Sequence, residues 1–231
     1  EYIVKEVLGY QAEGFKATKL KIGFEVDEDA ALIEAVRNAV GHDFGLMLDA
    51  NHGYDSIDAI RLAQKVEHLN LGWFEEPVPP EDLEGYLAVK ASTSIPMAGG
   101  ECEYTRFGFR EVLKLGAIDY LQPDICAAGG LSECKKIADM ANAFGVRLVP
   151  HVWGTGIGLS AGLHLLGVLP HNPPGRRPWE PMLEFDRSEH PARQAIMKTP
   201  IEHVSGVVQI PTGPGLGIEI DRDALASFTI T

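Results

Sequence analysis

Chemically capable side chains recur along this chain at one kind of position, the end of a short apolar or β-branched run. Neighbouring members of the series are 23 to 33 residues apart, the length expected for one strand and one helix. A strand usually ends in a turn residue, so a functional group at the same point of each unit predicts one site at the carboxyl ends of parallel strands. The series comprises Lys21, Asp49, Glu75, Glu101, Asp124, His151 and Glu184.

Three carboxylates, Asp49, Glu75 and Glu101, end consecutive units. If they converge they repel one another, and a hard cation removes that repulsion. An all-oxygen donor set with positions left for water and substrate suits Mg²⁺ better than zinc or copper. A single acid at a strand end more often caps a helix or pairs with a surface lysine. Three in a row favour a metal site.

Two lysines lie close together in the segment Lys16-Ala-Thr-Lys-Leu-Lys-Ile-Gly. Strand alternation puts Lys19 and Lys21 on one face and Leu20 on the other. Lysines that face an interior are costly unless they have a role. Two neighbouring ammonium groups favour loss of a proton from one of them, which can then act as a general base. The alternative is a charge pair on an exposed edge strand.

Asp124 and His151 lie one unit apart, in Gln122-Pro-Asp124 and Pro150-His151. If their side chains meet, the carboxylate orients and charges the imidazole, which makes an acid/base dyad. A lone histidine at a strand end is more often a bystander, and that alternative stays open here.

The elements that must position these groups follow a regular alternation. The sequence predicts strands at 17–21, 45–49, 73–75, 95–99, 120–122, 146–150 and 182–184. It predicts helices at 27–40, 56–69, 83–92, 106–115, 131–144 and 157–169. This order is typical of an α/β TIM-type barrel, whereas a doubly wound sheet would gather its site at one switch point.

The predicted domain organisation is a catalytic barrel over residues 1–190 and a tail over residues 191–231. Residues 1–14 have the pattern of the helix that follows a first strand, so we expect that strand to lie outside this sequence, in a longer polypeptide. The tail is rich in Pro and Gly, with a strand-like piece at 206–210. We expect it to complete the barrel and to pack on a part outside this sequence.

Composition limits the kinds of partner. The formal net charge is -13, which argues against nucleic acid and anionic membranes, since both need a basic face. The three cysteines show no CxxC spacing, so neither a disulfide framework nor a zinc site is indicated, and a reducing, cytoplasmic location is expected. We expect a soluble protein that binds a small carboxylate substrate. A homo-oligomer is left open.

Together these residues resemble the enolase superfamily, mandelate racemase subgroup, in order and spacing over essentially the whole chain. The motifs are Lys19-Leu-Lys21, Leu48-Asp-Ala-Asn51, Trp73-Phe-Glu-Glu-Pro77, Gly99-Gly-Glu101, Gln122-Pro-Asp124, Pro150-His151 and Leu183-Glu184. The resemblance implies a modified (β/α)7β barrel under an α+β capping domain that is almost wholly absent from this sequence.

The resemblance also implies residue roles. Asp49, Glu75 and Glu101 would be the Mg²⁺ ligands, with Glu76 the second choice beside Glu75. Lys21 would be one acid/base group and His151, paired with Asp124, the other. Glu184 would hydrogen-bond the substrate carboxylate while the substrate becomes an enediolate. Lys19 would lie beside that carboxylate.

The implied reaction is removal of the proton alpha to a carboxylate. The segments 49–54, 151–156 and 180–187 are similar to those of galactarolactone cycloisomerases and acid-sugar dehydratases, so the expected substrate is a sugar acid or its lactone. A dehydratase, or a racemase or epimerase, would use the same residues. Two alternative hypotheses place the protein in other functional classes. One is an NAD-dependent oxidoreductase, based on the glycine-rich residues 154–161, and the other is a catalytically inactive scaffold.

Overall fold

The computed structural model describes residues 1–169 and 180–229. The chain forms two compact units. The first unit is Glu1–Gly100 with Glu111–Leu121, and the second is Glu101–Arg110 with Gln122–Thr231. Helix α5 (Thr105–Leu115) contributes residues to both. The predicted boundary between residues 190 and 191 stays a prediction.

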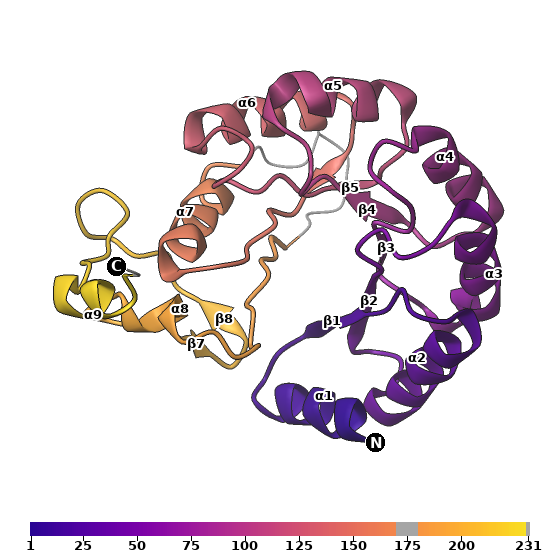
Figure 1. The fold of residues 1–231 in the computed structure, drawn as a ribbon, viewed down its shortest axis with the longest axis horizontal. Coiled ribbons are helices and arrows are strands. Elements are labelled where there is room, and N and C mark those ends of the chain that lie inside the picture. The colour runs from indigo at the N-terminus through magenta and orange to yellow at the C-terminus, as the bar shows by residue number, and fades with distance from the viewer. Residues whose placement is uncertain (170–179, 230–231) are drawn as a thin grey trace. The chain divides into compact units, whose positions relative to one another are not determined.

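The first unit is a parallel sheet with helices between its strands. Its strands are β1 (Ala17–Lys21), β2 (Gly45–Asp49), β3 (Phe74–Glu75), β4 (Met97–Gly99) and β5 (Tyr120–Leu121), paired in that order. Its other elements are α1 (Tyr2–Ala12), α2 (Val26–Val40), α3 (Ser56–Val66), the 3-10 helix η1 (Glu67–Leu69) and α4 (Leu83–Ser92). Figure 1 shows α2, α3 and α4 along one side of strands β1 to β4. The alternation predicted for these residues is confirmed, although β3, β4 and β5 are shorter than expected.

Burial on both faces explains why the strands read as apolar runs. Leu46, Leu48 and Phe74 are fully buried on one face, and Met47 is buried on the other, as parallel strands covered on both faces require. Each such side chain contributes roughly 1.5–3 kcal/mol by leaving water. Helix starts are set by capping acids: Asp55 accepts the Asp58 amide, and Asp82 accepts the Gly85 amide.

Arg37 is a buried cation in α2 that joins three segments of the first unit. It is 2% exposed. Its guanidinium donates to the carbonyl oxygens of Leu69 (2.8 Å), Gly41 (2.7 Å), Phe44 (2.7 Å) and Asn70 (3.0 Å). The planar fork of arginine suits several carbonyls at once.

We expect Arg37→Met to lower the free energy of unfolding by about 3 kcal/mol, because it strips buried carbonyls of their donor. Urea unfolding followed by circular dichroism measures the change. Arg61→Met is the matched control, since Arg61 is on α3 and pairs with Asp58 at an exposed site. Equal stability of the two variants would contradict the structural role of Arg37.

The second unit contains the remaining elements. These are α6 (Leu131–Ala143), β6 (Arg147–Leu148), α7 (Gly156–Leu166), α8 (Ala192–Ala195), β7 (His203–Val204), β8 (Val207–Val208) and α9 (Arg222–Ser227). A parallel bridge joins Asp124 to His151, and β7 and β8 form an antiparallel hairpin. The expected piece at 206–210 is the short β8. The strand predicted at 182–184 is wrong: the structure describes these residues as irregular.

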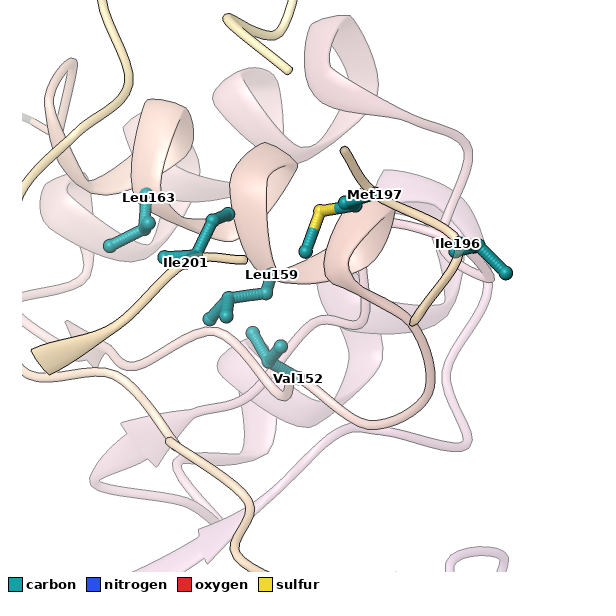
Figure 2. Packing of buried hydrophobic residues seen from close by; sticks show 6 residues of the cluster. All are labelled: Val152, Leu159, Leu163, Ile196, Met197 and Ile201. Atoms are coloured by element: carbon teal, nitrogen blue, oxygen red, sulfur yellow. The ribbon is translucent and has the colours of Figure 1, made fainter. Parts of the chain in front are cut away.

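The tail packs onto α7 in this unit. Figure 2 shows the buried cluster formed by Val152, Leu159 and Leu163 with Ile196, Met197 and Ile201 from the tail. Helix α7 has small residues where the contact is close. A Cβ on Gly162 would lie 2.8 Å from Val152 Cγ2, and Gly156 lies directly against Met197. Within residues 1–169 and 180–229, none of the helices has the length and apolar character needed to cross a membrane.

Candidate active site

Both predicted lysines lie on β1 and reach the carboxylates of the neighbouring strands. Lys19 Nζ bonds Glu75 Oε1 and lies 3.2 Å from Asp49 Oδ2. Lys21 Nζ bonds Asp49 Oδ2 and donates to Asn51 Oδ1 at 2.8 Å. The Lys19 side chain is 14% exposed and that of Lys21 59% exposed. Both lysines therefore compensate the buried charge of Asp49, and the Lys21 side chain is also largely exposed to solvent.

Asp49 and Glu75 are paired across β2 and β3 and are almost completely buried, at 0% and 1% exposed. Burial raises the pKa of Asp49, but the charges of Lys19 and Lys21, with the Asn51 amide, outweigh it and hold that pKa below its usual value. Two carboxylates on adjacent strands are a hard-oxygen donor pair. Their chemistry fits a divalent cation such as Mg²⁺.

Two neighbours of these acids were not among the predicted site residues. Trp73 Nε1 donates to Glu75 Oε2 at 2.9 Å, which fixes the far oxygen of that carboxylate. Asn51 has φ 42°, and its side-chain oxygen accepts a hydrogen bond from Lys21. Both residues belong to motifs noted in the sequence, but their contacts depend on backbone geometry that spacing does not reveal.

A buried acid on α2 organises the loop after Lys21. Asp29 Oδ2 accepts the amides of Gly23 (3.0 Å), Phe24 (2.9 Å) and Glu25 (3.2 Å), together with the Tyr54 hydroxyl. Burial and the hydrogen bond to Asp29 both raise the pKa of Tyr54. The loop after β1 is thereby tied to the loop after β2. Nothing in the sequence pattern marked Asp29, because acids in a first helical turn are common.

The predicted dyad forms in the second unit. His151 Nδ1 lies 2.7 Å from Asp124 Oδ2, and both side chains are largely buried. Asp124 Oδ1 accepts the amides of Cys126 (2.6 Å) and Ala127 (3.2 Å). Burial opposes ionisation of Asp124, but the hydrogen bond and charge of His151, and these amides, hold its pKa below the usual value. Asp124 therefore orients His151 as an ionised partner.

Two further predicted acids lie near His151 in the same unit. His151 Nε2 is 3.2 Å from Glu101 Oε2, and Glu184 Oε2 accepts the Val152 amide at 3.0 Å. Burial alone would lower the pKa of His151. The Asp124 hydrogen bond and the charges of Glu184 and Glu101 outweigh burial and raise it to about 9. Both ring nitrogens thus face carboxylate oxygens, an arrangement that favours the protonated imidazole.

Each unit therefore gathers part of the predicted set. Lys19, Lys21, Asp49 and Glu75 meet in the first unit. Glu101, Asp124 and Glu184 lie around the imidazole of His151 in the second unit. The predicted ligand set that adds Glu101 to Asp49 and Glu75 stays a prediction.

The glycine-rich residues 154–161 have a packing explanation. Gly156 lies against Met197, and a Cβ on Gly158 would be 3.3 Å from Cys126 Sγ. Two of these glycines are therefore buried against the protein's own side chains, and their small size serves packing. This arrangement argues against the nucleotide-binding reading of the glycine-rich segment.

Parallel βα units with lysines, buried carboxylates and a His–Asp pair at the ends of their strands define an acid/base enzyme domain of the α/β class. The chain belongs to the enolase C-terminal domain-like family, whose profile matches residues 3–224. The predicted recognition is confirmed. So is the fold class, parallel βα units matching the TIM-barrel-like C-terminal domain of the enolase superfamily.

Curated relatives with clear identity are acid-sugar enzymes. The chain is 52% identical over 223 residues to D-galactarolactone cycloisomerase of Agrobacterium fabrum, covering 96% of this chain and 59% of that protein. It is 35% identical over 217 residues to arabinonate dehydratase of Saccharolobus solfataricus, covering 94% of this chain and 56% of that protein. The chain thus spans less than two thirds of the length of these relatives.

Similar solved structures belong to the same kinds of enzyme. The 3,6-anhydro-D-galactonate cycloisomerase of Zobellia galactanivorans matches with a TM-score of 0.91 and 44% identity, over 98% of this chain and 62% of that one. A racemase of Streptomyces coelicolor, solved with bound magnesium, matches with a TM-score of 0.85 and 28% identity, over 99% of this chain and 59% of that one. The relatives are thus isomerases and lyases, the class predicted for this chain.

Proposed function

We propose that this chain carries the catalytic machinery for Mg²⁺-dependent removal of the proton alpha to a carboxylate, through an enediolate, in a sugar acid or its lactone. The particular activity proposed is that of a galactarolactone-type cycloisomerase. The 52% identity to a D-galactarolactone cycloisomerase supports this choice.

The observation that carries the proposal is the arrangement around β1. Lys19 and Lys21 bond two buried carboxylates on the next two strands. The Lys21 side chain is 59% exposed, so a substrate can reach it. Buried acids and a base beside them are costly to maintain for stability alone. They suit a site where charge develops during reaction.

The residues divide into three roles. Asp49, Glu75 and Glu101 are the proposed Mg²⁺ ligands, and the ion would supply charge that stabilises the developing enediolate. Lys21 removes or returns the alpha proton at Nζ, and His151, held by Asp124, does so from the other face of the carbon. Lys19 and Glu184 interact with the substrate carboxylate as its charge grows. In the cycloisomerase reaction the β-oxygen expelled belongs to the lactone ring.

A second candidate is an acid-sugar dehydratase. The same proton removal followed by expulsion of a β-hydroxyl gives elimination, and the 35% identity to an arabinonate dehydratase favours this candidate. A racemase or epimerase would use both acid/base groups without expelling oxygen.

The proposed partners and location follow from the proposed reaction and the composition. The substrate is a small carboxylate, with no nucleic acid or membrane partner, and a homo-oligomer is left open. A cytoplasmic location remains an expectation from cysteine usage. The buried Cys134, whose thiol pKa burial raises to about 11, is consistent with a structural thiol.

Proton NMR in D₂O tests the function. The full-length protein that contains this chain is offered galactarolactone, galactarate and a panel of aldarates and aldonates with Mg²⁺, and EDTA is the control. We expect conversion or alpha-deuterium exchange that EDTA abolishes. The product distinguishes cycloisomerase, dehydratase and racemase. Absence of exchange with every acid, in folded protein that binds Mg²⁺, would reject the proposal.

A further inference from the structure

Arg193, in the tail, makes a dense set of hydrogen bonds in the second unit. Nε donates to Gly154 O (3.1 Å), and Nη1 donates to the carbonyls of Asp186 (3.2 Å) and Ser188 (2.6 Å). Nη2 bonds Asp186 Oδ2 and lies 3.3 Å from Ser188 Oγ. The side chain is 11% exposed. One guanidinium therefore links residue 154 to residues 186–188.

The two linked segments carry predicted catalytic groups. Gly154 lies three residues after His151, and Asp186 two residues after Glu184. The Val152 amide already donates to Glu184 Oε2, which joins the segments once more. Neither segment is held by a strand ladder at these residues: His151 makes an isolated bridge, and residues 182–186 are irregular. Side chains must therefore supply the rigidity that hydrogen-bonded strands give elsewhere.

Arg193 itself is firmly anchored. Its helix, α8, is followed by Ile196 and Met197, which are buried in the cluster on α7. The next residue, Gln194, ties α8 to Ile201: its side chain donates to Ile201 O (3.0 Å) and accepts the Ile201 amide (3.1 Å). A small cavity is lined in part by Glu184, Arg193 and Gln194. Without the guanidinium, this space would let the Glu184 segment move.

We propose that Arg193 is a positioning residue that clamps the segment after His151 to the segment after Glu184. Its role in turnover rests on the proposed function, but the clamp itself does not. A proton transfer depends on placement to a fraction of an ångström, so a loosened pair of loops should slow the chemical step more than it weakens substrate binding. The tail would then contribute to catalysis through its own side chain as well as through packing.

Only arginine fits this task. Its fork spans carbonyls on two segments and a carboxylate, whereas a lysine ammonium is a single point with three donors. Arg193→Lys should therefore behave much like Arg193→Ala. Free guanidinium should restore part of the function of Arg193→Ala, because that variant leaves room for it.

Amide hydrogen exchange tests the clamp independently of activity. The Val152 amide, bonded to Glu184, and the Ser188 amide, bonded to Asp186 Oδ1 at 2.8 Å, report on the two segments. In Arg193→Ala we expect both to exchange at least about tenfold faster, since charge-assisted bonds are lost. Lys198→Ala is the matched control, because it removes an exposed tail cation paired with Glu219. It should leave both amides unchanged.

Kinetics test the consequence for turnover. We expect Arg193→Ala to lower kcat about 100-fold with a much smaller change in KM, and guanidinium below denaturing concentration to recover part of kcat. Unchanged exchange at Val152 and Ser188 would overturn the clamp. Faster exchange with an unchanged kcat, or a loss of kcat without rescue, would overturn the positioning role. If the wild type turns over no acid, the proposed function fails, and the exchange rates alone decide the clamp.

Discussion

Lys21→Met should lower kcat by about 10²- to 10⁴-fold while leaving the fold intact, because it removes a general base while Lys19 still pairs with Asp49. The Lys21 side chain is 59% exposed, and its ammonium contacts Asp49 and Asn51 rather than packing against apolar groups. Lys19 is a poorer probe, since it compensates two buried carboxylates and its removal would destabilise the sheet.

Deuterium incorporation at the alpha carbon, followed by NMR, separates the base from other effects. The control is Lys16→Met, since Lys16 is exposed and lies just before β1 at the opposite end from Lys21. His151→Asn should lose only the exchange or protonation assigned to the other face. Wild-type exchange in Lys21→Met, with His151 intact, would remove Lys21 from the mechanism.

The βα alternation was predictable because each unit leaves a local signal. The helix predicted at 83–92 matches α4 (Leu83–Ser92), which begins after the capping acid Asp82. The strand predicted at 182–184 fails for a physical reason. The segment is held by side-chain hydrogen bonds in place of a strand ladder: the Glu184 carboxylate accepts the Val152 amide, and Arg193 donates to the carbonyl of the nearby Asp186. An apolar pattern does not distinguish such a segment from a short strand.

The predicted acid/base groups share a recognisable position at strand ends, so residue type and spacing were sufficient to find them. Asp29, Arg37 and Arg193 show no such regularity. Each is a charged residue on a helix, a position normally exposed. Their roles come from backbone groups distant in sequence: Arg37 bonds residues 69 and 70, and Arg193 bonds residue 154. Only the folded chain brings these partners together.

Glu75 and Glu76 are adjacent acids, and we expect only Glu75 to bind metal. Both are 1% exposed. Glu75 ends β3 in register with Asp49, and its carboxylate meets Lys19 and Trp73. Glu76 has φ 43°, which takes it out of the strand, and its Oε2 lies 3.1 Å from His52 Nε2. The backbone turn therefore sends the second carboxylate to a different partner.

Glu75→Gln should therefore weaken Mg²⁺ binding by at least about 100-fold, since loss of a direct ligand exceeds the 10- to 100-fold cost of losing an outer-shell partner. Glu76→Gln, which removes the same charge one residue later, should bind Mg²⁺ nearly as the wild type does. Isothermal titration with Mg²⁺ measures both, and circular dichroism checks that each variant is folded. The reverse order of affinities would make Glu76 the ligand. It would also reassign Glu75 to a structural ion pair with Lys19, because a carboxylate already neutralised by an ammonium and an indole N–H needs no cation.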